Sequence, residues 1–176
     1  VTAPRTQALL QDLESRIYAI ALVHQKLYQS DDLSRMDLAD YLTELTDQIE
    51  ASYGLRERGI RMETDLESTP AVIDQAVPIG LALNELLSNA TKHAFVGRER
   101  GTISVGLKAR DAAMVLTVED DGVGAPDDAL SESSGIGLQT LRALVEMQLG
   151  GAIECEVENG TRWILTIPTR AHDTTR

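Results

Sequence analysis

Cysteine is nearly absent from the sequence, which limits how the chain can be stabilised. Cys155 is the only cysteine, so no disulfide can form within the chain. A single thiol in a predicted strand is typical of proteins in a reducing compartment. We therefore expect a cytoplasmic location.

Positive charge is also scarce. Lys and Arg together number 16 against 28 Asp and Glu, which gives a formal net charge of -12 and an isoelectric point near 4.6. Because a phosphate backbone requires a basic protein surface, this balance argues against a nucleic-acid partner.

Long apolar runs and targeting signals are missing as well. No stretch reaches the roughly 20 apolar residues that a membrane-spanning helix needs, and no signal peptide is visible. We therefore expect no membrane contact by this part of the protein, although a membrane sensor upstream is compatible with it. The chain also lacks internal repeats. Its 176 residues, 43% of them hydrophobic, suffice for one α/β domain with a helical appendage.

One predicted helix carries the most informative polar residues. Apolar residues recur every three or four positions over about residues 74–94, with Asp74 as the expected N-cap. Four polar side chains are expected to converge on the side opposite most of the leucines: Glu85, Asn89, Lys92 and His93. Carboxylate and amide oxygens suit Mg²⁺, and a cation suits phosphates. The stripe indicates a site for ATP and a divalent metal, or else an ordinary solvated helix face.

Two predicted strands lead into a glycine-rich turn. Alternating apolar residues predict strands over 102–108 and 114–119, with a short turn near Asp111. The second strand runs into Asp120-Asp121-Gly122-Val123-Gly124, where the glycines permit a tight turn that a planar base can approach. Asp120 can accept a hydrogen bond from an exocyclic amine, so it is the candidate adenine reader. The alternative is an ordinary loop, because Asp and Gly are common in turns.

A second glycine-rich segment precedes another predicted helix. Ser131 to Ser134 and then Gly135-Ile136-Gly137-Leu138 lead into an amphipathic helix that Gly150-Gly151 ends. Unpaired N–H groups at such a helix start suit phosphate oxygens, and a flexible connector is the alternative. A hairpin of strands 152–157 and 162–167 follows. Thr161 begins its last strand and is either a site residue or simply a β-branched strand residue.

In this order the segments resemble the ATP-binding domain shared by sensor histidine kinases, gyrase-type ATPases, mismatch-repair ATPases and Hsp90 chaperones. The resemblance covers about residues 55–168, and its motifs are the family's N box, two Gly boxes and closing Gly-Thr at 83–95, 120–124, 134–138 and 160–161. It implies that Asn89 holds Mg²⁺, that Asp120 binds the adenine amine and that Thr161 supports it through a water. The same resemblance assigns the rest of the ATP site to Lys92, His93, Gly122, Gly124, Gly135, Gly137 and Leu138.

Glu85 has more than one assignment by the same resemblance. It stands where many such kinases have Asn, and where the related ATPases have a Glu that orients the attacking water. It is therefore assigned to catalysis together with Lys92, as a base or an orienting group, or to support of the metal beside Asn89.

The N-terminal third points to the kinases within this family. Apolar spacing predicts a helix over residues 6–29 and a second helix from an N-cap at Asp37 to Gly54. The stretch 16–28 and the segment after it are similar to the later dimerisation helix and linker of a bacterial sensor-kinase subfamily with a short lid, close to the HWE type. A Trp-x-Glu motif is absent. The resemblance implies a homodimer through the N-terminal helices and a response-regulator receiver domain as partner.

The phosphoacceptor histidine of such kinases lies in an earlier helix, and nothing before Thr6 matches it. We therefore expect that the chain is a fragment, since it lacks an initiating Met, or that its acceptor lies on another protein. His24 lies between Ile20 and Leu27 on the apolar side of its helix, which predicts a packed core or interface residue and not the phosphorylated one.

These observations predict an α+β fold: a two-layer α/β sandwich with a mixed, mainly antiparallel sheet, preceded by dimerisation-type helices. We expect a partial helical region at 1–53, an ATP-binding catalytic domain at 54–170 and a tail at 171–176. The predicted function is the catalytic portion of a sensor histidine kinase, which transfers the γ-phosphoryl group of ATP to a His for relay to a response-regulator Asp. The alternatives are a phosphotransfer or scaffold protein that no longer binds nucleotide and an anti-sigma-type serine kinase.

Overall fold

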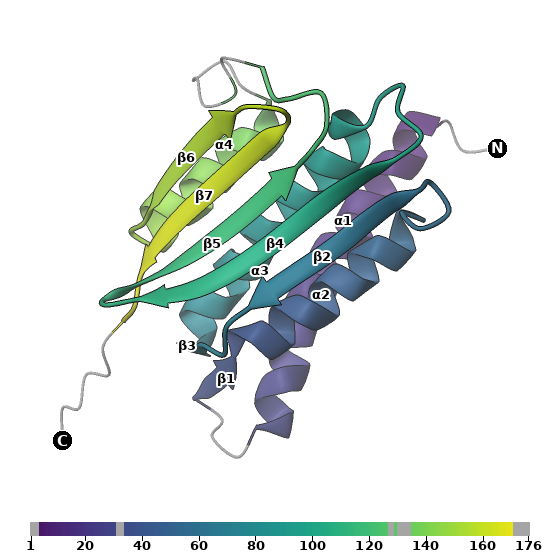
Figure 1. The fold of residues 1–176 in the computed structure, drawn as a ribbon. Helices are drawn as coiled ribbons and strands as arrows, with labels where there is room; N and C mark the ends of the chain where they lie inside the picture. The colour runs from purple at the N-terminus through teal and green to yellow at the C-terminus, as the bar shows by residue number, and fades with distance from the viewer. Residues whose placement is uncertain (1–3, 31–33, 127–128, 130–134, 171–176) are drawn as a thin grey trace, which may run out of the picture.

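The fold places a group of helices on one face of a sheet (Figure 1). The computed structural model describes residues 4–30, 34–126, 129 and 135–170. In chain order the elements are α1 (Pro4–Gln29), β1 (Arg35–Asp37), α2 (Leu38–Ser52), β2 (Ile60–Leu66), β3 (Pro70–Val72), α3 (Ile73–Asn89), η1 (Ala90–Ala94), β4 (Gly101–Arg110), β5 (Ala113–Asp120), α4 (Ile136–Arg142), η2 (Ala143–Gln148), β6 (Ala152–Val157) and β7 (Thr161–Pro168).

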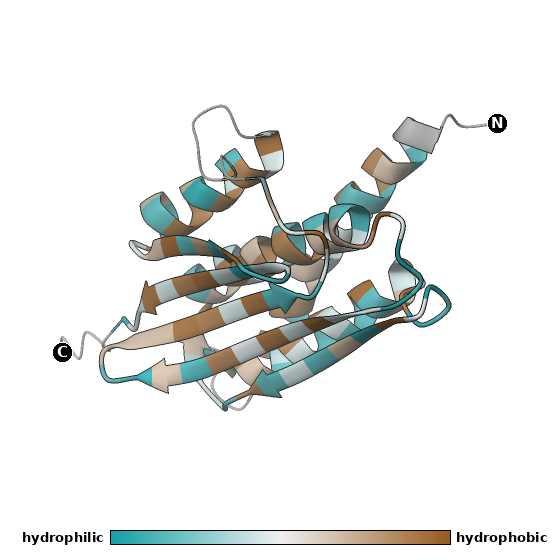
Figure 2. Ribbon diagram, turned by 45° about the horizontal axis from the view of Figure 1, so that its top comes forward, coloured by the Kyte–Doolittle hydropathy of each residue, from teal (hydrophilic) through white to brown (hydrophobic). Residues whose placement is uncertain are grey.

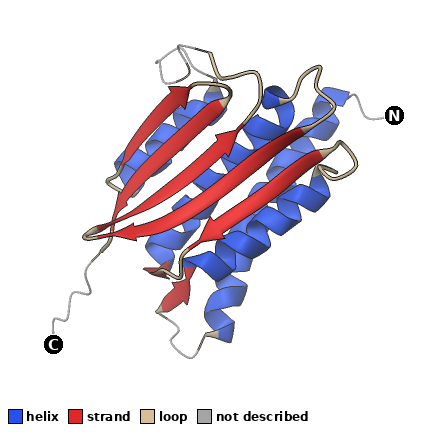
Figure 3. Cartoon of the chain, viewed as in Figure 1, coloured by secondary structure: helices blue, strands red, loops and turns tan. Residues whose placement is uncertain are grey.

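The main sheet has five strands in the order β2-β4-β5-β7-β6. β2 pairs with β4 in parallel, and the other neighbours pair antiparallel. The helices cover one face of this sheet and leave the other face uncovered (Figure 3). The predicted two-layer sandwich with a mixed, mainly antiparallel sheet is confirmed.

Alternation along the central strands explains why the sheet has one buried face. In β5 the buried positions alternate with partly buried or exposed ones, and β4 and β7 show the same period over most of their length. Apolar and polar bands succeed one another along these strands (Figure 2). Since successive side chains of a strand point to opposite faces, this pattern packs one set against the helices. The inward set is Ile103, Val105, Leu107, Met114, Leu116, Val118, Trp163, Leu165 and Ile167.

Three strands were not predicted from the sequence. β2 lies at the edge of the sheet and has a mostly polar sequence, with only Ile60 fully buried, so its apolar alternation is weak. β1 and β3 are short and form a separate antiparallel pair. The predicted strands at 102–108, 114–119, 152–157 and 162–167 are confirmed as β4 to β7.

The helix that carries the N box differs from its prediction at both ends. It begins after Val72, which makes no side-chain cap, and Asp74 lies in the first turn, so the prediction of Asp74 as N-cap is wrong. The α-helix ends at Asn89 and continues as one wider π-helical turn, η1. Such turns are rare and occur frequently at functional sites. Lys92 and His93 both lie in this turn.

The N-terminal helices pack into the same core as the sheet. Both predicted helices are confirmed, and Asp37 caps α2 by accepting a hydrogen bond from the Ala39 backbone N–H at 2.9 Å. Tyr41 on α2 donates a hydrogen bond to the carbonyl oxygen of Ala19 on α1, at 2.9 Å. A Cβ on Gly80 of α3 would lie 1.8 Å from the Tyr41 hydroxyl oxygen. Three helices therefore meet at this tyrosine, where Gly80 leaves the room for its ring.

His24 is exposed on α1, so the prediction of a core position for this histidine is wrong. Its helix turns the opposite side, with Ala19, Leu22 and Val23, toward the protein. The outer side is also apolar, because it carries the exposed side chains of Leu10, Leu13, Ile17 and Ile20. The interface part of the prediction stays a prediction. Among the described residues, no helix combines the length and the apolar character needed to span a bilayer.

Candidate functional site

A cavity of about 490 Å³ lies where α3 and η1 face the ends of β5 and β7. Its walls are largely apolar and include Leu86, Ala90, Val118 and Trp163. The predicted site residues that line it are Asn89, His93, Asp120, Gly124, Gly135, Gly137, Leu138 and Thr161. The fold therefore brings together residues from all four motifs. A mostly apolar cavity with a few convergent polar groups is the usual form of a small-molecule site.

Asp120 and Thr161 form the polar end of this cavity. They are opposite one another in the register of β5 and β7, and they are only 7% and 5% exposed. The Asp120 carboxylate accepts hydrogen bonds from the Gly122 backbone N–H, at 2.9 Å, and from Thr161. Burial raises the pKa of Asp120, although the hydrogen bonds from Gly122 and Thr161 partly oppose this. The result is a fixed acceptor at the edge of an apolar space.

Two glycines beside Asp120 allow the close approach of the turn and the last strand. Gly160 has a φ of +131°, and a Cβ there would lie 1.8 Å from the Asp120 carbonyl oxygen. A Cβ on Gly122 would lie 2.3 Å from the Ala94 carbonyl oxygen. Gly122 is not among the residues that line the cavity, and its place is against the end of η1. There the Val123 backbone N–H donates to the Ala94 carbonyl oxygen at 2.8 Å.

The four polar side chains predicted to converge on one patch are divided in two by the structure. Asn89 and His93 line the cavity, whereas Glu85 and Lys92 do not. Glu85 and Lys92 lie on another side of α3 and η1, where they pair with Arg16 and Asp12. That side faces α1. The expectation of a single patch is therefore wrong, because α1 covers half of it.

Both of these side chains form ion pairs with α1. The Lys92 Nζ lies 2.5 Å from both carboxylate oxygens of Asp12, and Glu85 pairs with Arg16. Burial raises the pKa of Glu85, with Arg16 acting in the opposite direction. Burial would also raise the pKa of Asp12, but the hydrogen bond from Lys92 and those from Tyr53 and Ser88 lower it overall.

A hydrogen-bonded group joins α1, α2 and α3 beside these ion pairs. The Tyr53 hydroxyl lies 2.9 Å from Asp12 Oδ1 and 3.2 Å from the Ser88 hydroxyl, and burial raises the pKa of Tyr53 to about 12. Ser15 donates a hydrogen bond to the side-chain oxygen of Asn84. Sequence reasoning missed Asp12 and Arg16. Their opposite charges four residues apart were visible, but helical periodicity does not say which neighbouring helix a charged side chain will face.

The oxygen donors available for a metal are few. Among the residues that the structure describes, no group of three or more His, Cys, Asp or Glu side chains is arranged to hold an ion. Mg²⁺ commonly uses one or two protein oxygens together with substrate phosphates and waters. A single carboxamide such as Asn89 in a nucleotide-sized cavity suits this pattern, whereas a site built wholly from protein ligands does not.

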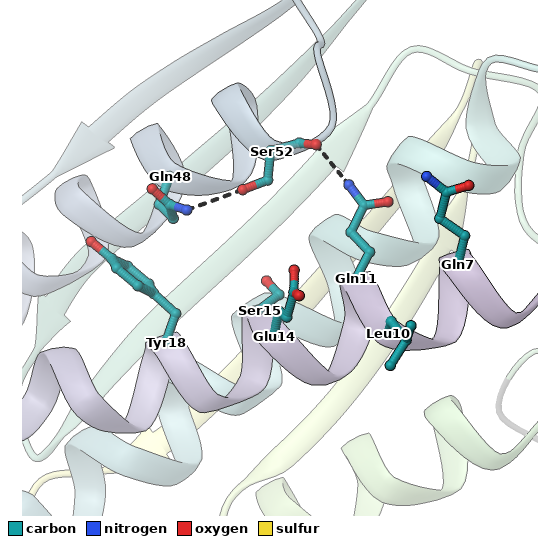
Figure 4. Close-up of a pocket in the computed structure, with 8 residues that line it drawn as sticks. All are labelled: Gln7, Leu10, Gln11, Glu14, Ser15, Tyr18, Gln48 and Ser52. Atoms are coloured by element: carbon teal, nitrogen blue, oxygen red, sulfur yellow. Dashed lines mark hydrogen bonds between the residues drawn. The ribbon is translucent and has the colours of Figure 1, made fainter. Parts of the chain in front are cut away.

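A second cavity, of about 610 Å³, lies between α1 and α2 (Figure 4). Gln11 donates to the Ser52 carbonyl oxygen at 2.6 Å, and Gln48 donates to the Ser52 hydroxyl at 3.1 Å. Most of its lining consists of amide and hydroxyl side chains. It contains no glycine-rich turn and none of the predicted site residues.

Two segments that the sequence analysis singled out lie outside the described residues. These are Ser131 to Ser134, which precede the second Gly box, and the expected tail at 171–176. The helix predicted after the second Gly box is confirmed as α4, which begins at Ile136 and continues into η2.

Two family models match the chain. Residues 74–171 match the model described as "Histidine kinase-, DNA gyrase B-, and HSP90-like ATPase". Residues 1–53 match a second model, described as "Histidine kinase". The first match includes all four motifs that line or support the cavity.

Curated relatives and solved structures agree with these matches. The chain is 27% identical over 168 residues to the sensor histidine kinase PdtaS of Mycobacterium tuberculosis, covering 92% of this chain and 32% of that protein. It is 29% identical over 140 residues to the blue-light-activated histidine kinase 2 of Erythrobacter litoralis, covering 76% and 40%. The chain thus spans about a third of the length of the first of these relatives.

Among solved structures, the fold is similar to the histidine kinase domain of a blue-light activated histidine kinase from Erythrobacter litoralis. The TM-score is 0.81 at 26% sequence identity, covering 90% of this chain and 75% of that one. The similarity extends over both the helices and the sheet.

Proposed function

Because the chain belongs to the histidine kinase-, DNA gyrase B- and HSP90-like ATPase family, we propose that it is the catalytic, ATP-binding portion of a two-component sensor histidine kinase. The observation that carries this proposal is the cavity in which Asn89 faces Asp120 and both Gly boxes. The match of residues 1–53 to a histidine kinase model supports a kinase in preference to the other members of the family.

The apolar walls of the cavity suit a purine base, and its polar end suits the amine of adenine. Asp120 would accept a hydrogen bond from the exocyclic amine of adenine, and Thr161 would support it. The half-buried Leu138 and the buried Trp163 provide apolar surface for the base. Gly124, Gly135 and Gly137 also line the cavity, where they have no side chains to occupy it. His93 is exposed at the cavity and would face the ribose or phosphates.

Asn89 is the residue that would hold Mg²⁺, with Glu85 as a supporting group through water. When bound, the ion spreads the negative charge of the phosphates during phosphoryl transfer. Lys92 would add a positive charge toward the same phosphates, since its ammonium is a compact cation. Phosphoryl transfer depends chiefly on positioning and charge stabilisation, and these side chains would provide both.

The acceptor in this proposal is a histidine upstream of the chain or on another copy. A neutral imidazole is the nucleophile, and its unperturbed pKa near 6.5 leaves it mostly unprotonated at neutral pH. From that histidine the phosphoryl group would pass to an Asp of a response-regulator receiver domain. Glu85 would orient or deprotonate the attacking group.

The exposed apolar side of α1 supports a homodimer through the N-terminal helices. Leu10, Leu13 and Ile17 are each more than half exposed, and such side chains in a continuous stripe mark interaction surfaces. We place the helical region at 1–53, the catalytic domain at 54–170 and the tail at 171–176, with the protein in the cytoplasm. An anti-sigma-type serine kinase should lack the helical segment at residues 6–29, and the presence of Asn89, Asp120 and both Gly boxes argues against a scaffold that no longer binds nucleotide.

Labelling with γ-phosphate-labelled ATP tests this proposal. The gene product, including any residues upstream of Val1, should acquire phosphate that is lost in acid and retained in base, as expected for phosphohistidine. Acid-stable label on serine would favour the anti-sigma-type kinase instead. Absence of nucleotide binding as well as of label would favour the scaffold.

A further inference from the structure

Two ion pairs connect α1 to the side of the N-box helix that does not line the cavity. Asp12 pairs with Lys92, and Arg16 pairs with Glu85. The pairs follow the antiparallel course of the two helices, because contacts earlier in α1 are made with residues later in α3 and η1. Together they engage both of the charged side chains to which the proposed function gives a catalytic role.

The ion pair between Lys92 and Asp12 prevents Lys92 from binding a nucleotide phosphate. Its ammonium lies 2.5 Å from both oxygens of Asp12, in a site where the Lys92 side chain is 30% exposed and the Asp12 side chain 25% exposed. Asp12 is also held by the Tyr53 and Ser88 hydroxyls. A carboxylate fixed in this way offers Lys92 the same kind of negative oxygen that a nucleotide phosphate offers. The two are therefore competitors for one cation.

The ion pair between Glu85 and Arg16 restrains the second catalytic side chain in the same way. Arg16 neutralises the carboxylate from the α1 side, while a Cβ on Gly137 would lie 2.8 Å from Glu85 Oε2. Glu85 thus lies between α1 and the start of α4. The contact with Arg16 leaves one donor unsatisfied, because Arg16 Nε is buried with no hydrogen-bond partner among the described residues. An incompletely satisfied contact costs less to open than one in which every donor is paired.

We propose that Asp12 and Arg16 form an inhibitory latch, in which α1 holds Lys92 and Glu85 away from the nucleotide and must release them for phosphoryl transfer. This inference rests on the proposed function, since it requires that Lys92 binds phosphate. Movement of α1 relative to α3 would couple the N-terminal helices to the ATP site. A shift of α1 opens both pairs together, because both latch residues lie on the same helix, one turn apart.

Nucleotide affinity tests the latch without relying on turnover. Asp12→Asn keeps the size of the side chain and removes its charge, so Mg-ATP should bind about two- to fivefold more tightly by calorimetry, the range expected when a partly exposed ion pair no longer competes. Adenosine, which has no phosphate, should bind with unchanged affinity. In a Lys92→Met background, Asp12→Asn should have no effect on Mg-ATP affinity, because the competed cation is gone.

Arg16→Met is the second variant. Releasing the Glu85 carboxylate adds a negative charge near the phosphates, so the ratio of ATP affinities with and without Mg²⁺ should increase. Lys26→Met is the matched control, since Lys26 on α1 pairs with Glu44 of α2 at 2.8 Å and touches neither Lys92 nor Glu85. It should leave every nucleotide affinity unchanged. Thermal melting of each variant checks that the fold is retained.

The outcomes separate the latch from the proposed function. If the parent chain binds Mg-ATP and Asp12→Asn leaves that affinity unchanged or weakens it, the latch is wrong while the nucleotide site stands. If neither the parent nor Asp12→Asn binds Mg-ATP, both proposals are wrong. Binding by Asp12→Asn alone would support both, since it would mean that the latch closes the site in the parent.

Discussion

Asp120 and Thr161 are direct cross-strand partners, although 41 positions separate them in the sequence. The antiparallel register of β5 and β7 puts both at the cavity end of the sheet, where the Asp120 carboxylate accepts hydrogen bonds from Thr161. The first Gly box and the closing Gly-Thr are therefore one structural unit. Gly160 makes this contact possible, because any side chain there would collide with the backbone of Asp120.

Base selectivity should depend on the Asp120 carboxylate. In Asp120→Asn, we expect ATP to bind about 10- to 100-fold more weakly, because a hydrogen bond to a charged group is worth roughly 1.5–3 kcal/mol. The preference for ATP over GTP should shrink by a similar factor, as measured by competition binding. The neighbouring Asp121 is exposed and accepts from the Thr102 backbone N–H at 2.8 Å, so Asp121→Asn is a suitable control that should keep the preference. Equal ATP and GTP affinities in the parent chain would contradict the role of Asp120.

The magnesium assignment depends on Asn89. Asn89→Ala should lower ATP affinity by at least about tenfold in the presence of Mg²⁺, the lower end of the range for losing a group that supports a metal. Without Mg²⁺ the same substitution should have little effect. Asp74→Asn, at an exposed position in the first turn of the same helix, provides the control. Calorimetry with and without the ion measures both effects, and an unchanged Mg²⁺ dependence in Asn89→Ala would remove the assignment.

The two glycines of the second Gly box should respond differently to the same substitution. A Cβ on Gly137 would lie 2.8 Å from Glu85 Oε2, whereas a Cβ on Gly135 has no heavy atom within 4 Å. Gly137→Ala forces the Glu85 carboxylate to move away from this position, which disturbs its ion pair with Arg16 and costs up to about 1 kcal/mol. We therefore expect Gly137→Ala to lower the melting temperature by a few degrees and Gly135→Ala to leave it nearly unchanged. Equal melting temperatures for the two variants would show that Glu85 does not occupy this place.

Stability should depend on pH through Asp12. Burial alone would raise the pKa of Asp12, but the hydrogen bonds from Lys92, Tyr53 and Ser88 lower it overall. A carboxyl group with a lowered pKa stabilises the fold above its unfolded pKa of about 3.9 and loses this contribution as the pH falls through the lower folded value. We expect Asp12→Asn to melt about 2–4 °C below the parent chain at pH 7, as for a loss near 1 kcal/mol in a domain of this size. The difference should disappear in acid below the ordinary range of Asp. A difference that persists there would mean that Asp12 stabilises the fold by packing and not by charge.

The sequence was sufficient for most of the fold because each long element has a strong period. The alternation in β4, β5 and β7 and the helical spacing in α2 both survive into the observed burial. β2 could not be predicted in the same way. Its side chains are mostly polar, and its residues pair with residues of β4 that lie 41 positions later in the sequence. Its place is determined by backbone pairing at the sheet edge, which leaves little trace in the sequence.

The candidate site was predictable where short motifs determine local geometry. The glycine turns and Asp120 belong to this class. The directions of Glu85 and Lys92 could not be predicted in this way, because they depend on which element covers their side of α3. That element is α1, which lies about 70 positions earlier in the sequence, as the hydrogen bond between Ser15 and Asn84 shows. His24 is a related case. The apolar residues around His24 predicted that this side of α1 is buried. The spacing could not show that α1 packs against the protein through the opposite side, with Ala19, Leu22 and Val23.

Binding of a magnesium nucleotide in this cavity can be measured by calorimetric titration of the purified chain with ATP. We expect a single saturable site whose affinity increases when Mg²⁺ is added and decreases in both Asn89→Ala and Asp120→Asn. No saturable heat with the parent chain or with Asp12→Asn, at nucleotide concentrations up to the millimolar range of cellular ATP, would contradict this expectation.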